Sequence, residues 1–480
     1  MGNLKQEIVK GTIWSGVQRY SGMVVSLVVS AVLARLLSPE EFGVVAIANV
    51  LIWFFSMFAT MGIGPAIIQR KDLTQNDLNN IFTFSFLVGI CFSLLFYLSS
   101  WIIASWYDNR ELVPVCQLLS LTLFLSTINM VPGALMAKNL RFKESAIITL
   151  ILQLVTGVIS VIAAYKGFGV YALLISPILA PIGSFIYNNR FYPVHLSRNL
   201  CLEPIRKIFS FSMYQFLFEL FNYFSRNLDK IVIGKYISMA DLGYYEKSYR
   251  LMQLPIQNVT SVINPVLQPV LSSLQDNPTE IGHKYCKLIK FIAAISFPLT
   301  VIIYVCGYEV IHLFYGANWD DAVPTFKILS LSVCMQMILS TSGAIFMASN
   351  NTKAQFWVGV RNTFTTVIGF IVAAYFFKTI EAIAWSWVIT LFINFVCTYY
   401  IMYRFVLKTS ILPLLHVFLH PLLNVLVLVV AGLLITHFIV VENDFVRLMI
   451  KGTSLFVLSI LYIQVSGQYD IIKAVKSKLK

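Results

Sequence analysis

The sequence predicts an all-α membrane protein with about fourteen transmembrane helices. Of its 480 residues, 58% are apolar and only 12% are charged, which is about half the charged share of an ordinary soluble domain. Apolar segments of roughly 20 residues, the length that crosses a bilayer, recur along the whole chain with short polar gaps between them. None of these gaps is long enough to fold as a separate domain.

The predicted spans follow the apolar segments in chain order. They cover residues 14–35, 43–66, 81–105, 113–136, 145–165, 168–188, 208–234, 243–271, 288–306, 323–348, 355–377, 382–403, 414–438 and 446–466. With the N-terminus inside, twenty lysines and arginines lie in the inside segments and five lie outside. This positive-inside bias persists along the chain, and the even number of spans places both termini in the cytoplasm of a bacterial inner membrane.

The net charge of +13 is explained by this topology, so it does not indicate nucleic-acid binding. The lysines of the C-terminal tail, residues 473–480, suit contact with anionic membrane lipid. The longest predicted outside loop covers about residues 307–322.

An internal repeat with an offset of 200 residues relates two parts of the chain. Residues 35–43 match residues 235–243 in the pattern basic, x, aliphatic, Ser, x, x, acid, apolar, Gly. Weaker matches follow in the same order: Gly64-Pro65 with Asn264-Pro265, and 134–137 with 345–348. Chance similarity among apolar helices is the alternative, and the ordered spacing argues against it.

The repeat predicts two lobes of six helices, residues 1–200 and 201–406, followed by two further helices and a basic tail in residues 407–480. Six helices return the chain to its starting side, so the lobes are parallel repeats about an axis along the membrane normal. In each matched turn a serine and an acid three residues later suit the N-terminus of a helix, where they cap free N–H groups.

Polar side chains line one face of several predicted spans. The seventh span carries Gln215, Glu219, Asn222, Arg226, Asp229 and Lys230, and the eighth carries Glu246, Arg250, Gln253, Gln257 and Asn264. The first span adds Gln18 and Arg19, the second adds Asn49, and the eleventh adds Arg361. A charge at the bilayer centre costs about 2.5–3.5 kcal/mol on insertion scales. We therefore expect these faces to line a hydrated cavity.

The predicted cavity is cationic. Its basic residues, Arg19, Arg226, Lys230, Arg250 and Arg361, outnumber the acids Glu219, Asp229 and Glu246. Because the planar guanidinium suits phosphate oxygens, the expected ligand is an anion. The alternative is that the charges only pair with one another as packing features. Glu219 and Asp229 are candidates for binding a proton or a sodium ion, and a salt-bridge role is the other interpretation of them.

Enzymatic motifs are absent from the sequence. His416 and His420 are four residues apart, but no carboxylate accompanies them at the start of an apolar helix. We find no P-loop, GxSxG or HExxH motif. The sequence therefore predicts no metal site, no cofactor and no enzymatic activity.

The chain resembles the polysaccharide transporter branch of the multidrug/oligosaccharidyl-lipid/polysaccharide flippase superfamily, that is, a Wzx-like or colanic-acid-type lipopolysaccharide flippase. The resemblance rests on residues 10–15 (KGTIWS), on the turn at 34–43 (ARLLSPEEFG) and on residues 61–66 (MGIGPA). It implies two six-helix lobes in a V around a cationic cavity, with two C-terminal helices after them.

The same resemblance implies the function. Such proteins move undecaprenyl-pyrophosphate-linked oligosaccharide, the repeat unit of O-antigen, capsule or exopolysaccharide, from the cytoplasmic to the periplasmic leaflet by alternating access. It makes Arg19, Arg226, Arg250 and Arg361 candidate contacts for the pyrophosphate or acidic sugars, matched by helix and face only. The expected partners are this substrate, membrane lipid, H⁺ or Na⁺ and other polysaccharide-assembly proteins, with no nucleic acid and a monomeric state.

Three rival functions remain open at this point. A cation-coupled multidrug exporter of the same fold would need an acidic cavity for cationic substrates. A polysaccharide polymerase or ligase would need a larger outside loop than residues 307–322. A channel or scaffold is disfavoured because a two-fold repeat with charges inside the membrane suits switching between states.

Overall fold

The computed structural model describes residues 2–60, 62–197, 201, 203, 205, 223, 226–275, 277–438 and 441–467, and all regular elements within these residues are helices. The chain divides into two compact units, Met1–Gly243 and Tyr244–Lys480. The lobe limits at residues 200 and 406 stay a prediction.

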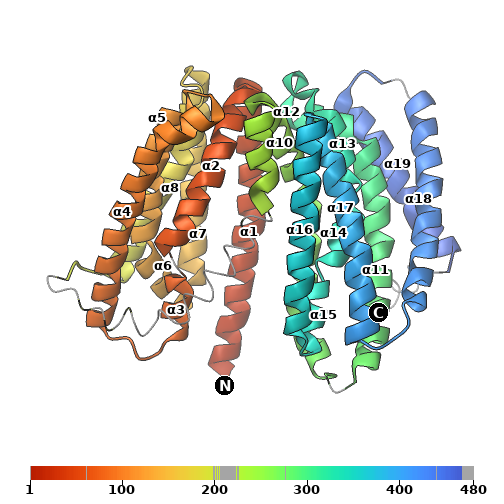
Figure 1. The fold of residues 1–480 in the computed structure, drawn as a ribbon, viewed down its shortest axis with the longest axis horizontal. Coiled ribbons are helices and arrows are strands. Elements are labelled where there is room, and N and C mark those ends of the chain that lie inside the picture. The colour runs from red at the N-terminus through yellow and green to blue at the C-terminus, as the bar shows by residue number, and fades with distance from the viewer. Residues whose placement is uncertain are drawn as a thin grey trace. The chain divides into compact units, whose positions relative to one another are not determined.

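The first unit is a bundle of long helices (Figure 1). Its elements are α1 (Gly2–Leu36), α2 (Pro39–Thr60), α3 (Ile63–Gln69), α4 (Gln75–Tyr107), α5 (Leu112–Ile128), α6 (Met130–Lys138), α7 (Phe142–Tyr165), α8 (Tyr171–Phe191) and the helical segment 226–236. Within this bundle α4 packs against α5, α7 packs against both α1 and α8, and α5 also contacts α2 and α8.

The second unit has the same kind of architecture. Its elements are α10 (Met239–Ser272), which begins at the end of the first unit, α11 (Pro278–Val305), α12 (Gly307–Tyr315), η1 (Ala317–Trp319), α13 (Ala322–Ser330), α14 (Val333–Leu339), α15 (Ser342–Ala348), α16 (Thr352–Phe376), α17 (Ile380–Ile401), the π-helical η2 (Met402–Val406), α18 (Leu412–Phe438) and α19 (Asp444–Val465). Here α16 packs against α17, and α11 packs against α18 and α14. The last helix, α19, contacts α18, α11 and α12.

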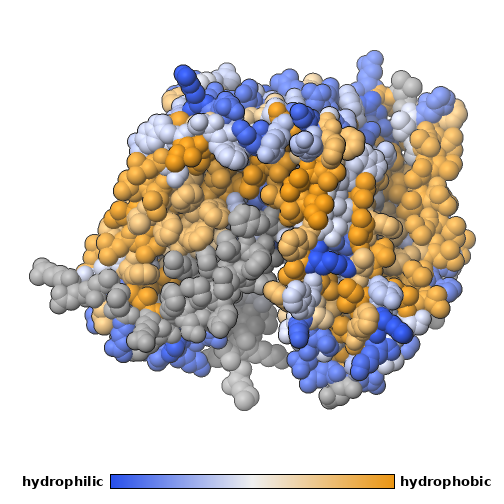
Figure 2. All heavy atoms as spheres, in the orientation of Figure 1, coloured by the Kyte–Doolittle hydropathy of each residue, from blue (hydrophilic) through white to orange (hydrophobic). Residues whose placement is uncertain are grey.

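The number of spans is compatible with fourteen. Ten described helices are long and apolar enough to cross a membrane, and two bent helix pairs raise the number to twelve. The predicted span 208–234 lies largely outside the described residues. The predicted span 243–271 is α10, a 34-residue helix whose polar stripe lowers its mean hydropathy. On the face shown in Figure 2, each unit carries a band of apolar side chains between hydrophilic ends.

The two bent spans occupy equivalent places in the repeat. The bend between α5 and α6 measures 41°, and the bend between α13 and the α14–α15 segment measures 45°. Pro132 explains the first bend, because proline lacks an N–H and its ring clashes with the carbonyl four residues earlier. At the second bend the Ser332 hydroxyl donates to the Leu329 carbonyl at 2.6 Å, which competes with the helical ladder. The equivalent placement supports the predicted repeat.

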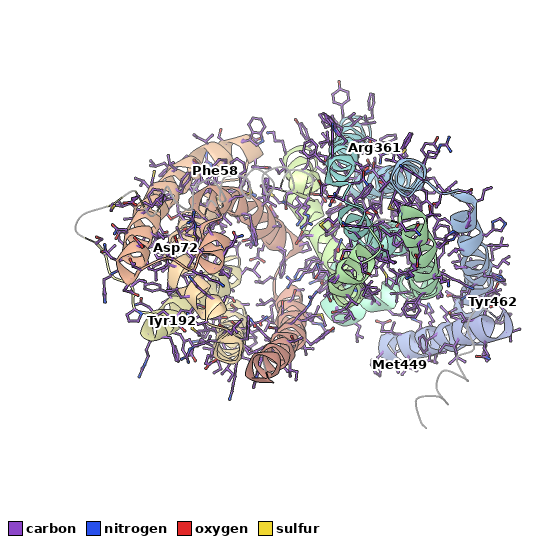
Figure 3. All side chains as sticks on the ribbon, turned by 90° about the horizontal axis from the view of Figure 1, so that it is seen from below. Phe58, Asp72, Tyr192, Arg361, Met449 and Tyr462 are labelled. Carbon is purple, nitrogen blue, oxygen red and sulfur yellow. The ribbon has the colours of Figure 1, made fainter. Side chains whose placement is uncertain are left out.

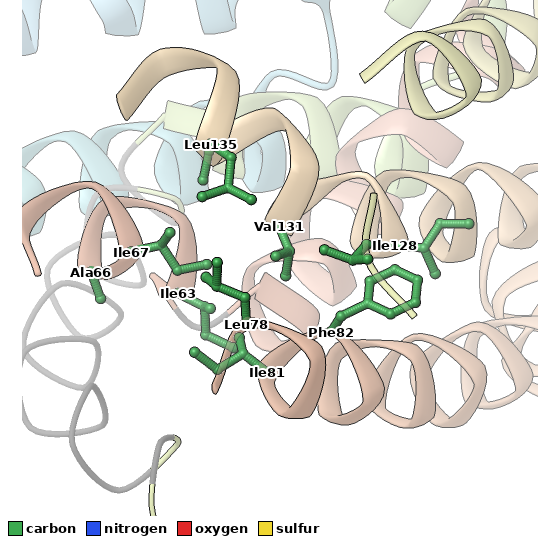
Figure 4. Packing of buried hydrophobic residues seen from close by; sticks show 11 residues of the cluster. Ile63, Ala66, Ile67, Leu78, Ile81, Phe82, Ile128, Val131 and Leu135 are labelled. Carbon is green, nitrogen blue, oxygen red and sulfur yellow. The ribbon is translucent and has the colours of Figure 1, made fainter. Parts of the chain in front are cut away.

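A buried cluster fixes the short helix α3 (Figure 4). Ile63 and Ile67 of α3 pack with Ile81 of α4 and Val131 of α6, all at most 3% exposed. The chain leaving α8 also lies along α4, where the N–H of His195 donates to Asn79 Oδ1 at 3.0 Å. These contacts hold α3 and the chain that follows α8 against α4 and α6.

The structure confirms that the matched turns are capped helix starts. Ser38 and Glu41 form a reciprocal cap, with the Ser38 N–H donating to Glu41 Oε2 at 2.7 Å and the Glu41 N–H donating to Ser38 Oγ at 3.3 Å. In the second turn the Asp241 N–H donates to Ser238 Oγ at 3.0 Å. Both helices, α2 and α10, therefore begin with the same local device.

The two turns also meet at their glycines. A β-carbon on Gly43 would lie 1.7 Å from the carbonyl oxygen of Met239, and one on Gly243 would lie 2.0 Å from the carbonyl oxygen of Pro39. The contact is reciprocal between repeat-related residues. Only glycine permits the first turns of α2 and α10 to approach this closely.

Replacing Ser38 or Ser238 with alanine is expected to lower the free energy of unfolding by about 1 kcal/mol, the usual cost of losing an N-cap side chain. Thermal unfolding of the detergent-solubilised protein measures the change. The control is Ser15→Ala, at an exposed position inside α1, where alanine has the better helix propensity. Equal melting temperatures for the cap variants and this control would contradict the prediction.

Candidate functional site

In the first unit, α1 and α2 present the predicted cavity residues differently. On α1, Gln18 is half-buried and Arg19 is exposed. Gln18 shares the α1 face that packs against α7, where the Gly22 carbonyl accepts a hydrogen bond from Gln153 at 2.8 Å. On α2, Asn49 is half-buried. Of these three residues, Arg19 is therefore the most exposed.

The helical segment 226–236 carries three of the predicted residues of the seventh span. Arg226 is exposed, Lys230 is half-buried, and Asp229 is buried with 3% exposure. One carboxylate oxygen of Asp229 accepts a hydrogen bond from the Lys230 N–H at 2.9 Å. No described acidic side chain lies within ion-pair distance of Arg226. The predicted residues Gln215, Glu219 and Asn222 lie outside the described residues.

In the second unit, some residues of the polar stripe of α10 bind a neighbouring helix and others are exposed. Gln253 donates to the Tyr249 hydroxyl and to Gln336 Oε1 of α14, both at 3.0 Å. Asn264 donates to the Ser340 carbonyl at 3.4 Å. Arg250 and Gln257, on the same face, are exposed. The stripe therefore combines helix packing with a cationic surface.

Arg361 lies between α16 and α17 (Figure 3). Its guanidinium donates to Thr398 Oγ1 at 3.2 Å and to the Asn394 carbonyl at 3.3 Å, and it also contacts Asn362. The acceptor on Asn394 is its backbone oxygen, whereas its side-chain amide oxygen Oδ1 is buried and has no hydrogen-bond partner among the described residues. Within the described part of the chain Arg361 has no carboxylate partner, so neutral groups alone hold this cation.

The structure groups these residues only within each unit. It joins Gln253 to α14 and Arg361 to α17, and among the described residues no hydrogen bond joins Arg361 to α10. The common cavity formed by α1, α2, segment 226–236, α10 and α16 stays a prediction. So does the ion-coupling role of Glu219 and Asp229.

The sequence interpretation missed a charged cluster at one end of the second unit. Glu309 of α12 is 1% exposed and lies 2.7 Å from the Lys451 amine and 2.8 Å from the Arg447 guanidinium of α19. The position of Lys451 inside the apolar span 446–466 was a usable signal, because an unpaired charge there is costly. Its partner could not be found from the sequence. No group of described His, Cys, Asp and Glu residues has an arrangement that could hold a metal ion.

Sequence comparisons identify the family and several relatives of this chain. A family described as "Polysaccharide biosynthesis protein" matches residues 32–324. An "Uncharacterized membrane protein in cps region" of Klebsiella pneumoniae is 26% identical over 470 residues, which is 95% of each chain. The "Lipopolysaccharide biosynthesis protein WzxC" of Escherichia coli is 22% identical over 417 residues, covering 85% of this chain and 83% of that protein.

Among solved structures, the fold is similar to that of "Lipid II flippase MurJ, inward closed conformation". The TM-score is 0.74, with 97% of this chain and 100% of the other covered and 14% sequence identity. At this identity the similarity concerns the fold, and it agrees with a multi-pass helical membrane protein.

Proposed function

Because this chain belongs to the polysaccharide biosynthesis protein family, we propose that it is a flippase for lipid-linked oligosaccharide. Its substrate is an undecaprenyl-pyrophosphate-linked repeat unit of O-antigen, capsule or exopolysaccharide, which it moves from the cytoplasmic to the periplasmic leaflet. The names of WzxC and of the Klebsiella relative from a cps region support this assignment, as does a fold shared with a lipid II flippase.

The observation that carries the proposal is positive charge in spanning helices that has no acidic partner in the described part of the chain. Arg226 is exposed and Arg361 is held by neutral acceptors, and neither has an acidic partner among the described residues. Since an unpaired charge within the bilayer is costly, an anionic ligand supplies the missing compensation. A diphosphate accepts bidentate hydrogen bonds from guanidinium groups, so it fits these arginines.

The rival functions fit these observations less well. A multidrug exporter with cationic substrates would place carboxylates, rather than an excess of arginines, along its spans. A polymerase or ligase would need an open outside loop, whereas residues 307–322 fold into α12 and η1. In that segment Ile311 and Trp319 are fully buried, so it packs as part of the bundle.

The transport cycle uses the two capped turns. We place the pivot of alternating access at the contact between Gly43 and Gly243, where repeat-related helices touch through their backbones. Because this contact involves backbone atoms, the two helices can rock about it without changes of side-chain rotamer. The capped turns themselves stay rigid. The arginines of each repeat hold the diphosphate in turn, and several weak contacts allow its release. The lipid tail remains in the bilayer.

The protein acts as a multi-pass protein of the inner membrane, with both termini in the cytoplasm and as a monomer. Its other partners are membrane lipid and further proteins of polysaccharide assembly. Buried Asp229 is the described candidate for coupling transport to H⁺ or Na⁺. Its hydrogen bond from Lys230 fits a structural role equally well.

The Arg226→Ala/Arg250→Ala double variant is expected to abolish export, because it removes two cations that hold the diphosphate. The measurement is surface polysaccharide in a strain whose own copy is deleted and replaced by the variant. Arg110→Ala is the matched control, since Arg110 is exposed in a predicted outside loop and should leave export unchanged.

Normal surface polysaccharide in the double variant, at wild-type protein levels in the membrane, would refute the arginine assignment. The same strains are tested for resistance to a fluorescent organic cation. Loss of cation resistance with normal polysaccharide would favour the drug-exporter function.

A further inference from the structure

Six ionisable side chains form one cluster where α12 meets α19, and the proposed transport cycle makes no use of them. α12 contributes Glu309 and His312, residue Asp320 follows η1, and α19 contributes Asp444, Arg447 and Lys451. All belong to the second unit, and three of them lie in the loop 307–322 that the sequence predicts to be outside.

The first part of the cluster is the contact of the Glu309 carboxylate with two basic side chains. Its Oε1 lies 2.7 Å from the Lys451 amine and 2.8 Å from Arg447 Nε. Arg447 also pairs with Asp444 on its own helix. These contacts hold α19 against α12.

The second part of the cluster is His312 with the two carboxylates that contact it. His312 Nε2 contacts Asp320 Oδ1, and His312 Nδ1 lies 3.4 Å from Asp444 Oδ2. A neutral imidazole has one donor and one acceptor nitrogen, whereas an imidazolium has two donors. Because both ring nitrogens face carboxylate oxygens, only the imidazolium satisfies both contacts. In the neutral ring, one lone pair would face an anionic oxygen.

Charge balance favours the same form. The carboxylates Glu309, Asp320 and Asp444 face two permanent cations, Arg447 and Lys451. A proton on His312 makes the cluster neutral, and its loss leaves one negative charge in excess. The remaining group against the ring is Tyr308, which stacks on it with centroids 4.2 Å apart and lies 5.3 Å from the Arg447 guanidinium carbon.

We propose that His312, between Asp320 and Asp444, is a proton-binding site that fastens α19 to the α12–η1 segment when it is protonated. The ligand is a proton, since the described residues contain no group suited to a metal ion. Histidine is the side chain that ordinarily changes charge between pH 5 and 8. The ring is 12% exposed, so protons reach it from the adjacent solvent. The last helix is thereby held more tightly under acidic conditions than under alkaline ones.

The sign of the pH effect follows directly. Both contacts of the ring are complete only in the imidazolium, so the added hold on α19 is present when the ring is protonated at acidic pH and is lost with that proton as the pH rises. The test is thermal unfolding of the full chain in detergent at pH 5.5 and pH 8.0, for the wild type and for His312→Gln. The wild type is expected to melt about 1–2 °C higher at the acidic pH through this site, and His312→Gln is expected to lose that difference.

His420→Gln is the matched control, because His420 is exposed on α18; this variant should keep the wild-type difference. Asp320→Asn leaves the ring in place and should reduce the difference, which keeps the test valid if His312→Gln does not fold. With six histidines in the chain, NMR of histidine-labelled protein identifies the His312 signal by its absence from the His312→Gln spectrum. A neutral ring at pH 6, or an unchanged pH difference in both variants, would overturn the proposal.

Discussion

Replacing Gly43 or Gly243 with alanine is expected to destabilise the protein by about 3 kcal/mol, at the upper end of the usual cost of overpacking. The new β-carbons would lie 1.7 Å from the Met239 carbonyl oxygen and 2.0 Å from the Pro39 carbonyl oxygen. These obstacles are backbone atoms near capped helix starts, so no side-chain rotation relieves the clash. The first turns of α2 and α10 would have to move apart. Thermal unfolding in detergent measures the loss.

Two other glycines provide the controls. A β-carbon on Gly16 of α1 or Gly359 of α16 meets no atom within 4 Å. Alanine at these helical positions is expected to be neutral or to stabilise by up to about 1 kcal/mol, because glycine is the poorer helix former. The expected effects thus differ in sign between the two pairs of positions. If Gly43→Ala melts like Gly359→Ala, the close contact does not exist in the folded protein.

Replacing Glu309 with glutamine is expected to cost about 3–5 kcal/mol, the usual loss when one partner of a buried ion pair is removed. Glu309 is 1% exposed and Lys451 is 5% exposed. Without the carboxylate, the Lys451 amine remains buried among apolar helices with no counter-charge from α12. The double variant Glu309→Gln/Lys451→Met should recover most of the stability, because it removes both buried charges. Denaturant or thermal unfolding of the three proteins measures this coupling.

An exposed ion pair on α11 serves as the control for this buried ion pair. Glu280 and Lys284 of α11 lie 3.1 Å apart, with side chains 43% and 50% exposed. Glu280→Gln is expected to change the stability by less than about 0.5 kcal/mol, as for exposed pairs spaced four residues apart on a helix. A cost for Glu309→Gln as small as this, or a double variant less stable than the single one, would contradict the buried pair.

Much of the fold could be predicted because its signals are local. Hydropathy located the spans: α4, α7 and α18 each enclose the predicted segment. The serine and acid of each matched turn predicted that helices begin at Pro39 and Met239. The serine caps both helices as expected. The family resemblance, based on short motifs, is confirmed by the match over residues 32–324.

The candidate site was less predictable. Helical spacing placed Gln253 and Arg250 on one face of α10, but it could not tell that Gln253 binds α14 while Arg250 is exposed. Arg361 was recognised as an intramembrane charge, whereas its neutral partners on α17 lie more than thirty residues away. The spacing of polar residues predicts which side chains share a helix face. It does not predict which neighbouring helix packs against that face.

The sequence by itself determined the membrane class, the order of the spans and the repeated capped turns, because hydrophobicity and capping depend on residues within a few positions of one another. Only the tertiary structure decided that Gly43 meets Gly243 and that Glu309 meets Lys451, which is 142 positions away. It also placed His312 between two carboxylates from different segments. Such pairs are selected by how helices pack, and packing depends on the shape of the whole bundle rather than on any local pattern.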